Sequence, residues 1–242
     1  MVTRLVLLVV GGYLLGSLPL TYLVAKLSRG IDLRRYGSGS VGATNLTRAT
    51  SKWAGMSAGA FDFGKGMLMV WAAQAVGLGL GAQVAVGMAV IIGHNWSVFL
   101  RFSGGRGILT TLGVALILPL VHGLTPWGVI AGLSIVAVCL LVLRNLPLGV
   151  AGGVASLPLV SWGVGEPLSL NLGFLAMFLV VVIKRLAVPR AAIAASLSTR
   201  EVLFNRLLFD RDIRDREAWI HRTPQEASSS GGQRGQKRGS PQ

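Results

Sequence analysis

Apolar stretches that approach or reach the length of a membrane-spanning helix recur along the chain. They fall at about residues 5–28, 53–78, 82–100, 108–123, 127–143, 147–163 and 169–183. A helix needs roughly 17–25 such residues to cross a bilayer, and inside lipid only helices and closed barrels satisfy their backbone polar groups. The sequence therefore predicts an all-α membrane protein, a polytopic bundle of about seven transmembrane helices, with five or six spans as the alternative.

Composition excludes the common soluble classes. Hydrophobic residues make up 52% of the chain and charged residues 13%, with a mean hydropathy of +0.64, whereas soluble domains carry about 25% charged residues. A soluble enzyme, a nucleic-acid binder and a disordered chain are ruled out. The single cysteine, Cys139, lies in an apolar run, so the sequence offers neither a disulfide framework nor a cysteine-rich metal site.

The net charge of +14 indicates orientation in the membrane. Lys and Arg are retained on the cytoplasmic side of membrane proteins. An external N-terminus places 21 of the 23 basic residues inside and leaves only Arg4 outside and Lys65 within a span. We therefore predict an external N-terminus, a cytoplasmic C-terminus and two glycine-rich loops that face the cytoplasm.

The chain divides into three parts by composition. Residues 1–186 form the predicted transmembrane domain. Residues 187–227 alternate apolar side chains with arginines, a pattern that predicts a basic amphipathic cytoplasmic tail able to lie on an anionic lipid surface. Residues 228–242 have almost no apolar content and are predicted to be disordered.

The first cytoplasmic loop, residues 36–48, combines three glycines, four hydroxyl side chains, one amide and one arginine. Glycine lets backbone N–H groups approach an anion, hydroxyls donate to phosphate oxygens, and arginine offers two parallel donors. A phosphate cradle and a small-residue turn between helices are equally compatible with this pattern. The candidate phosphate contacts are Ser38, Gly39, Gly42, Thr44, Asn45 and Arg48.

The second cytoplasmic loop, residues 93–107, ends in Gly104–Gly105–Arg106–Gly107, which opens the next apolar helix. Backbone amides and the positive end of a helix dipole favour an anion at such a position. His94 has two interpretations: a proton carrier or phosphate donor, or a histidine that orders the loop through hydrogen bonds. The second interpretation is at least as well supported by the sequence.

Charged residues inside the predicted spans are few. Asp62 and Lys65 are three residues apart, which places them on one helical face where each can neutralise the other. A structural role, in which this buried ion pair holds the helices together, is favoured over a catalytic role because neither residue adjoins the glycine loops in sequence. Up to residue 165 the only carboxylates are Asp32 and Asp62, so we expect no metal site of several acidic ligands.

Four motifs together resemble a known family. They are Gly16–Ser17–Leu18–Pro19, GSGSVGATN at 37–45, DFGKG at 62–66 and GHNWSVFLRFSGGRG at 93–107. Over about residues 11–115 the chain resembles the bacterial acyl-phosphate-dependent glycerol-3-phosphate acyltransferases. The resemblance implies a multi-pass inner-membrane enzyme of phospholipid synthesis that uses no cofactor. It would transfer a fatty acyl group from acyl phosphate to glycerol 3-phosphate, which gives lysophosphatidic acid.

The resemblance also assigns site residues and exposes departures from the family pattern. Ser38, Arg48 and Arg106 would contact phosphate, with Arg106 in place of the usual lysine and Ser40 in place of an asparagine. Pro147 stands near a position where the family tends to have serine. If Arg206–Leu207 corresponds to the family's late arginine–leucine pair, then the preceding His and Asn positions are occupied by Arg200 and Leu203.

Two alternatives to an enzyme remain at this stage. A degenerate paralogue would bind phosphorylated lipid or glycerol phosphate without turnover, because the later motifs are altered. A small anion transporter would use the same loops as its binding site, but it predicts an inverted repeat that the two halves of the sequence do not show.

Overall fold

The computed structural model describes residues 1–188 and 191–220, and throughout this part the regular structure is helical. The predicted all-α membrane fold is confirmed. The predicted disordered segment, residues 228–242, lies outside the described residues, as does the end of the predicted tail. The helices are α1 Val2–Ser17, α2 Leu20–Arg29, α3 Ala43–Ala49, α4 Lys52–Ala75, α5 Leu80–Asn95, α6 Ile108–Leu120, α7 Trp127–Leu141, α8 Leu146–Gly163, α9 Leu168–Leu186, α10 Thr199–Phe209 and α11 Arg216–Ile220.

Four helical segments of the described chain are long and apolar enough to cross a membrane, and α6 and α7 are shorter apolar helices. The four segments are Val2–Arg29, Leu80–Leu100, Leu146–Gly163 and Leu168–Leu186. Every predicted span contains a helix, including the polar α4, whose 24 residues carry Asp62 and Lys65. The count of seven crossings itself stays a prediction.

Local sequence signals explain several helix ends. Pro19 separates α1 from α2, because proline lacks the N–H that a continuous helix needs. Gly30 ends α2 in the left-handed conformation, with a φ of 69°. Ser51 caps α4, since its side chain accepts a hydrogen bond from the backbone N–H of Ala54. These signals set where the cytoplasmic loops begin and end.

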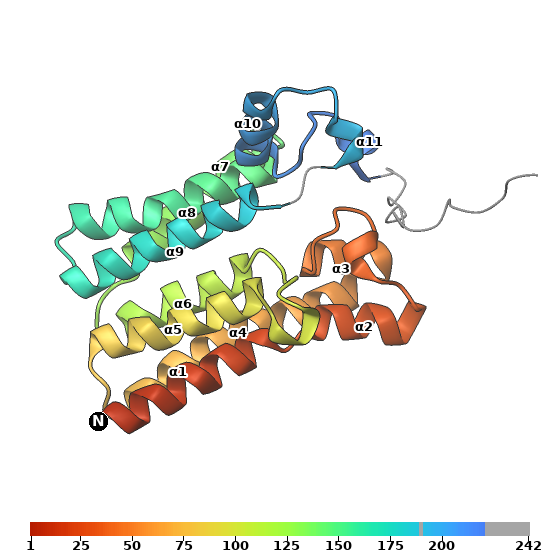
Figure 1. The fold of residues 1–242 in the computed structure, drawn as a ribbon. Helices are drawn as coiled ribbons and strands as arrows, with labels where there is room; N and C mark the ends of the chain where they lie inside the picture. Colours follow the sequence, from red (N-terminus) through yellow and green to blue (C-terminus); the bar gives the residue numbers. More distant parts are fainter. Residues whose placement is uncertain (189–190, 221–242) are drawn as a thin grey trace, which may run out of the picture.

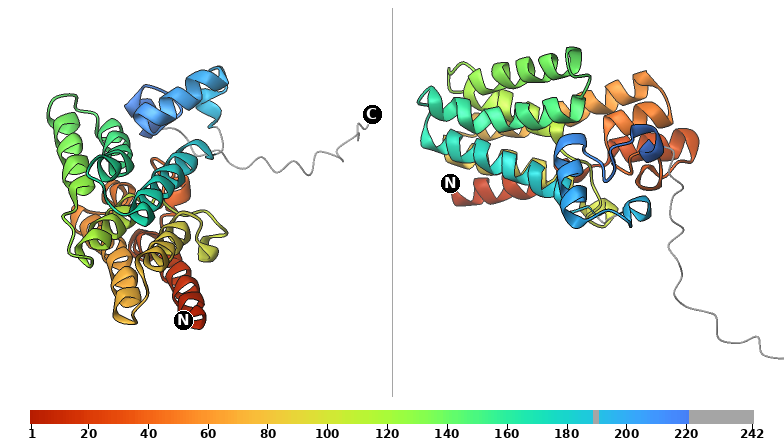
Figure 2. Two further views of the ribbon diagram at one scale, coloured as in Figure 1. Left: turned by 90° about the vertical axis from the view of Figure 1, so that its left-hand side faces the viewer. Right: turned by 90° about the horizontal axis from the view of Figure 1, so that it is seen from above.

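The helices pack in two groups (Figure 1). One group contains α1, α4, α5 and α6, the other contains α7, α8 and α9, and α5 contacts α9 to join them. Helices α2, α3, α10 and α11 gather at the end of the bundle away from the N-terminus, as the second view from above also shows (Figures 1 and 2). The predicted tail therefore folds back on the bundle, where α10 contacts α8 and α9.

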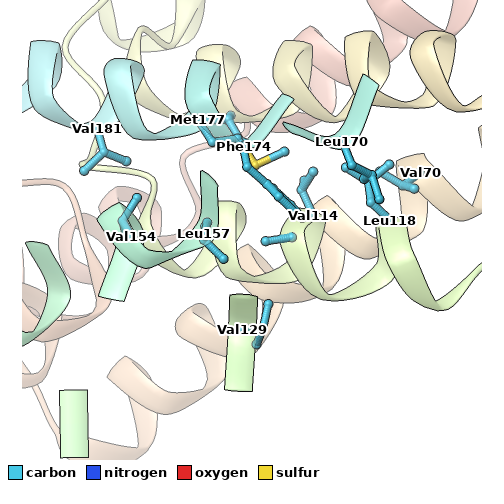
Figure 3. Close-up of a cluster of buried hydrophobic side chains, with 12 residues drawn as sticks. Val70, Val114, Leu118, Val129, Val154, Leu157, Leu170, Phe174, Met177 and Val181 are labelled. Atoms are coloured by element: carbon cyan, nitrogen blue, oxygen red, sulfur yellow. The ribbon is translucent and has the colours of Figure 1, made fainter. Parts of the chain in front are cut away.

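Buried apolar side chains fill the interface between the two groups (Figure 3). Phe174 and Met177 of α9 meet Val114 and Leu118 of α6 and Leu157 of α8. In a bilayer the lipid is as apolar as the protein interior, so close packing and polar contacts hold helices together. This core fixes the position of α9. The C-terminal end of α9 lies at the same end of the bundle as the two glycine loops.

Glycines bring α1 and α5 into close contact. A Cβ atom at Gly16 would overlap the backbone of Val90, and one at Gly93 would overlap the backbone of Tyr13. Small residues of this kind allow membrane helices to approach each other at backbone distance. The same contact includes Ser17, whose carbonyl accepts a hydrogen bond of 2.6 Å from the Ser97 hydroxyl. The second glycine loop is thereby anchored directly after α5.

Candidate active site

Asn45 organises the first glycine loop. Its side-chain Oδ1 accepts a hydrogen bond from the Ser38 N–H at 3.2 Å, and its Nδ2 donates to the carbonyls of Leu33, Tyr36 and Ser40 at 2.9 to 3.2 Å. Only 2% of Asn45 is exposed. Because its amide is engaged by the loop backbone, Asn45 shapes the loop that presents Ser38.

The glycines of the second loop allow three segments to pack tightly. Gly104 and Gly105 donate backbone hydrogen bonds to the carbonyls of Asn95 and His94 at 3.2 and 3.1 Å. A Cβ atom at Gly105 would overlap both the His94 ring and the carbonyl of Val41. The backbone amides of Gly104 and Gly105 are thus used within the chain, and Gly105 joins the second loop to the first.

A cavity of about 430 Å³ opens where the two loops meet the end of α9 and the tail. The first loop contributes Ser38 and Gly39, and the second contributes residues 103–106. Six cationic side chains line it against two carboxylates, Asp210 and Asp212. The six are Arg34, Arg106, Lys184, Arg185, Arg206 and Arg211. Such an excess of positive charge around one cavity selects for an anionic ligand.

Two of these arginines hold shielded nitrogens that make no hydrogen bond within the described chain, Arg185 Nε and Arg206 Nη2, whereas Arg106 Nε lies 2.7 Å from Asp210 Oδ1. Arg185 is only 4% exposed. Buried polar atoms in folded proteins nearly always have a partner, so unsatisfied guanidinium donors around one cavity need an explanation. A phosphate group offers several acceptor oxygens and enough negative charge for two of these arginines.

The structure separates the predicted site residues into two sets. Those that line the cavity are Ser38, Gly39, Gly104, Gly105 and Arg106. Those outside its lining are Gly42, Thr44, Asn45, Arg48, His94 and Gly107. Residues of both glycine loops thus line the same cavity.

Arg48 acts on the cavity through its charge. Partial burial lowers the pKa of the Arg48 guanidinium, and the neighbouring positive charges of Arg216 and Arg106 lower it further. This mutual repulsion shows that the cation excess extends beyond the cavity wall. Neutralisation by a bound anion would relieve it.

Asp62 and Lys65 form the predicted ion pair, with 2.8 Å between Lys65 Nζ and Asp62 Oδ1. Lys65 Nζ also donates to the Gly16 carbonyl at 2.8 Å, and both charged groups lie close to His94 Nδ1, at 3.1 Å from Lys65 and 3.3 Å from Asp62. Although neither residue adjoins the glycine loops in sequence, α4 packs against α5 and the pair lies beside His94, where the second loop begins.

His94 connects this ion pair to the second loop. Its Nδ1 faces Asp62 and Lys65, its Nε2 faces Gly105, and its carbonyl accepts the Gly105 N–H. The ring lies behind Gly104 and Gly105 rather than in the lining of the large cavity. These contacts favour the interpretation of His94 as a residue that orders the loop.

Sequence reasoning missed Lys184 and Arg185, which it counted only as charges that report topology. Arg185 donates to the carbonyls of Leu207 at 2.9 Å and Pro147 at 3.0 Å, so it links the end of α9 to α10 and to the start of α8. The sequence feature that could have identified these two residues as part of the site is the Lys–Arg–Leu sequence at the end of the last apolar span.

The family model that matches this chain is described as glycerol-3-phosphate acyltransferase and covers residues 6–194. The predicted correspondence of Arg206–Leu207 to the family's arginine–leucine pair needs correction, because these residues lie outside the match. Arg185–Leu186 is the arginine–leucine pair within it. The family's His and Asn positions, taken as six and three residues before the arginine, then fall on the apolar residues Leu179 and Val182.

Similar proteins are known by sequence and by structure. Glycerol-3-phosphate acyltransferase 5 of Dehalococcoides mccartyi is 41% identical over 93% of this chain and 96% of its own length. A glycerol-3-phosphate acyltransferase of Thermus thermophilus is 41% identical over 64% of this chain and 75% of its own. The crystal structure of PlsY, an integral membrane glycerol 3-phosphate acyltransferase, is 30% identical with a TM-score of 0.68, over 75% of this chain and 88% of that one. The chain belongs to the glycerol-3-phosphate acyltransferase family.

Proposed function

We propose that this protein transfers a fatty acyl group from acyl phosphate to glycerol 3-phosphate in the cavity between the two glycine loops, and so forms lysophosphatidic acid for phospholipid synthesis. The observation that carries the proposal is the cation-lined cavity, in which Arg185 Nε and Arg206 Nη2 make no hydrogen bond within the described chain. PlsY has been solved in a glycerol 3-phosphate form and a lysophosphatidic acid form, which supports the assignment of acceptor and product.

The cavity residues act by binding and by neutralising charge. In this proposal Arg106, Lys184 and Arg185 offset the negative charge of the two phosphate groups, and Ser38, which lines the same cavity, donates its hydroxyl to a phosphate oxygen. Holding two anionic reactants side by side in a cationic site removes much of the entropic and electrostatic barrier to their reaction. The positions Gly39, Gly104 and Gly105 keep the loop backbones close to these groups.

The transfer itself requires no dedicated base. The C1 hydroxyl oxygen of glycerol 3-phosphate attacks the acyl carbonyl carbon, the bond from that carbon to the phosphate oxygen breaks, and the departing phosphate takes the hydroxyl proton. The carboxylates that line the cavity, Asp210 and Asp212, are each ion-paired with an arginine, Arg106 and Arg206 respectively. Proton transfer to the donor phosphate is therefore the proposed route.

The donor is the first testable prediction. The purified protein in detergent micelles should release phosphate when supplied with acyl phosphate and glycerol 3-phosphate, should show no turnover with acyl-CoA, and should keep its activity in EDTA. The cavity of about 430 Å³ is lined by short glycine loops and cationic side chains that suit a phosphate group. Equal rates with acyl-CoA, or loss of activity in EDTA, would contradict the mechanism.

The same assay separates the enzyme from the binding-only alternative, which the comparisons do not favour. Pro147, Leu179 and Val182 depart from the family pattern and are the positions where lost turnover would originate. Binding of glycerol 3-phosphate, measured by calorimetry, without phosphate release from acyl phosphate would identify a degenerate paralogue.

The second prediction concerns topology. Both glycine loops and the tail lie at the end of the bundle away from the N-terminus (Figure 1), and this end carries most of the basic residues. With Cys139→Ala as background, a cysteine introduced at Ser38 should react with a membrane-permeant maleimide and resist an impermeant one in intact cells. A cysteine at Val2 is the matched control and should react with both. Impermeant labelling at position 38 would reverse the proposed orientation.

A further inference from the structure

The part of the tail beyond residue 194, where the family match ends, contributes one wall of the cavity. Its cavity-lining residues are Arg206, Asp210, Arg211, Asp212 and Trp219. Helices α10 and α11 lie at the same end of the bundle as α3 (Figure 1). The match to the Dehalococcoides mccartyi relative covers 93% of the 242 residues, which necessarily includes α10. The similarity to this relative therefore extends through α10.

Asp210 contacts the arginine that the second loop presents to the cavity. Its Oδ1 lies 2.7 Å from Arg106 Nε and 3.7 Å from Arg185 Nε, and its backbone carbonyl accepts from Arg106 Nη2 at 3.2 Å. Arg106 Nε is therefore ion-paired with Asp210, whereas Arg185 Nε, at 3.7 Å, makes no hydrogen bond within the described chain. One carboxylate thus lies between two arginines and supplies a single negative charge.

The end of α10 holds Asp210 in this place. Asp210 follows the last residue of the helix in the left-handed conformation, with a φ of 57°, and its N–H donates to the Arg206 carbonyl. Glycine adopts this conformation most readily, and Asn and Asp adopt it more readily than other residues do. Asparagine or glycine at position 210 therefore preserves the backbone while removing the carboxylate.

We propose that Asp210 is an internal counter-ion that a phosphate ligand displaces from Arg106 and Arg185, so that the tail sets the affinity of the site. The proposal rests on the proposed function for the identity of the phosphate ligand. Two cations are incompletely neutralised by one carboxylate, whereas a phosphate dianion supplies two charges and more acceptor oxygens. The carboxylate stabilises the arginines when the site is empty and competes with phosphate when it fills.

Titration with inorganic phosphate tests the proposal on the full-length protein in micelles. Asp210→Asn and Asp210→Gly should each bind phosphate about tenfold more tightly than the unchanged protein by calorimetry, because the competing carboxylate is gone. In the acyl transfer assay both should lower the KM for glycerol 3-phosphate without a matching fall in kcat.

Asp215→Asn is the matched control, since it removes the same charge from the same tail at a residue that instead caps α11 through the Ala218 N–H. Its phosphate affinity should stay within about twofold of the unchanged protein. Equal tightening in this control would mean that net charge, and not the place of Asp210, is responsible, which would overturn the proposal.

Weaker or unchanged phosphate binding in the Asp210 variants would show that Asp210 has only a structural role. If Asp210 only fastens the tail, removing its carboxylate opens the cavity, and phosphate binding weakens or stays unchanged. Loss of folded protein in both variants would lead to the same conclusion. If the Asp210 variants bind phosphate more tightly but the protein transfers no acyl group, the counter-ion role of Asp210 is supported and the proposed function is contradicted. If the protein transfers the acyl group but the variants bind phosphate with unchanged affinity, the proposed function is supported and the counter-ion role is contradicted.

Discussion

Replacing Arg106 by alanine is expected to lower kcat/KM for acyl transfer by about 10²–10³-fold, which corresponds to about 3–4 kcal/mol of lost transition-state stabilisation. Arg106 comes from the glycine loop that resembles the family motif, lines the cavity and forms an ion pair with Asp210. Its charge would act on a phosphate whose negative charge changes as the acyl bond breaks. Initial rates of phosphate release in micelles measure the effect.

Two further variants make this expectation specific. Arg106→Lys retains the charge and restores the residue usual in the family, so it should keep most of the activity. Arg200→Ala removes a charge from an exposed position on α10 that is not part of the cavity lining, and its rate should change little. Near-normal kcat/KM in Arg106→Ala would contradict the assignment of this cavity as the phosphate site.

The helices could be predicted from the sequence because the interactions that form a helix and end it are local in the chain. Each apolar run must satisfy its own backbone within lipid, and residues such as Pro19, Gly30 and Ser51 mark helix ends through their own conformational limits or side-chain bonds. The two glycine loops could likewise be recognised as a site from their composition. Their sequence brings together residue types that suit a phosphate.

The rest of the site depends on contacts between residues far apart in the chain. Lys65 of α4 and His94 of α5 meet because these two helices pack against each other. Lys184 and Arg185 follow a span, where basic residues are expected for topological reasons alone. Their second role becomes visible only when α9 is placed against the second loop, where Lys184 Nζ donates to the Asn95 carbonyl.

Asp210 shows why sequence patterns underestimate acidic residues in a basic segment. Residues 200–216 contain several arginines, so a carboxylate among them is most simply interpreted as a solvated neutralising charge. The fold of α10 instead turns it toward Arg106, an arginine that lies 104 residues earlier. The composition of the tail predicts attraction to phosphate. The structure adds Asp210, a carboxylate that would compete with phosphate for the arginines of the same site.

The largest stability loss is expected from Lys65→Met. This change leaves the Asp62 carboxylate, 4% exposed, without its cationic partner inside the bundle, and breaking a buried pair in this way costs about 3–5 kcal/mol. Thermal unfolding in micelles should therefore begin at a clearly lower temperature. Lys26→Met removes an exposed lysine from α2 and should have little effect. Adding Asp62→Asn to Lys65→Met should restore part of the loss, because the unpaired charge is then gone. A single variant as stable as Lys26→Met would show that the Asp62–Lys65 pair does not hold α4 against His94.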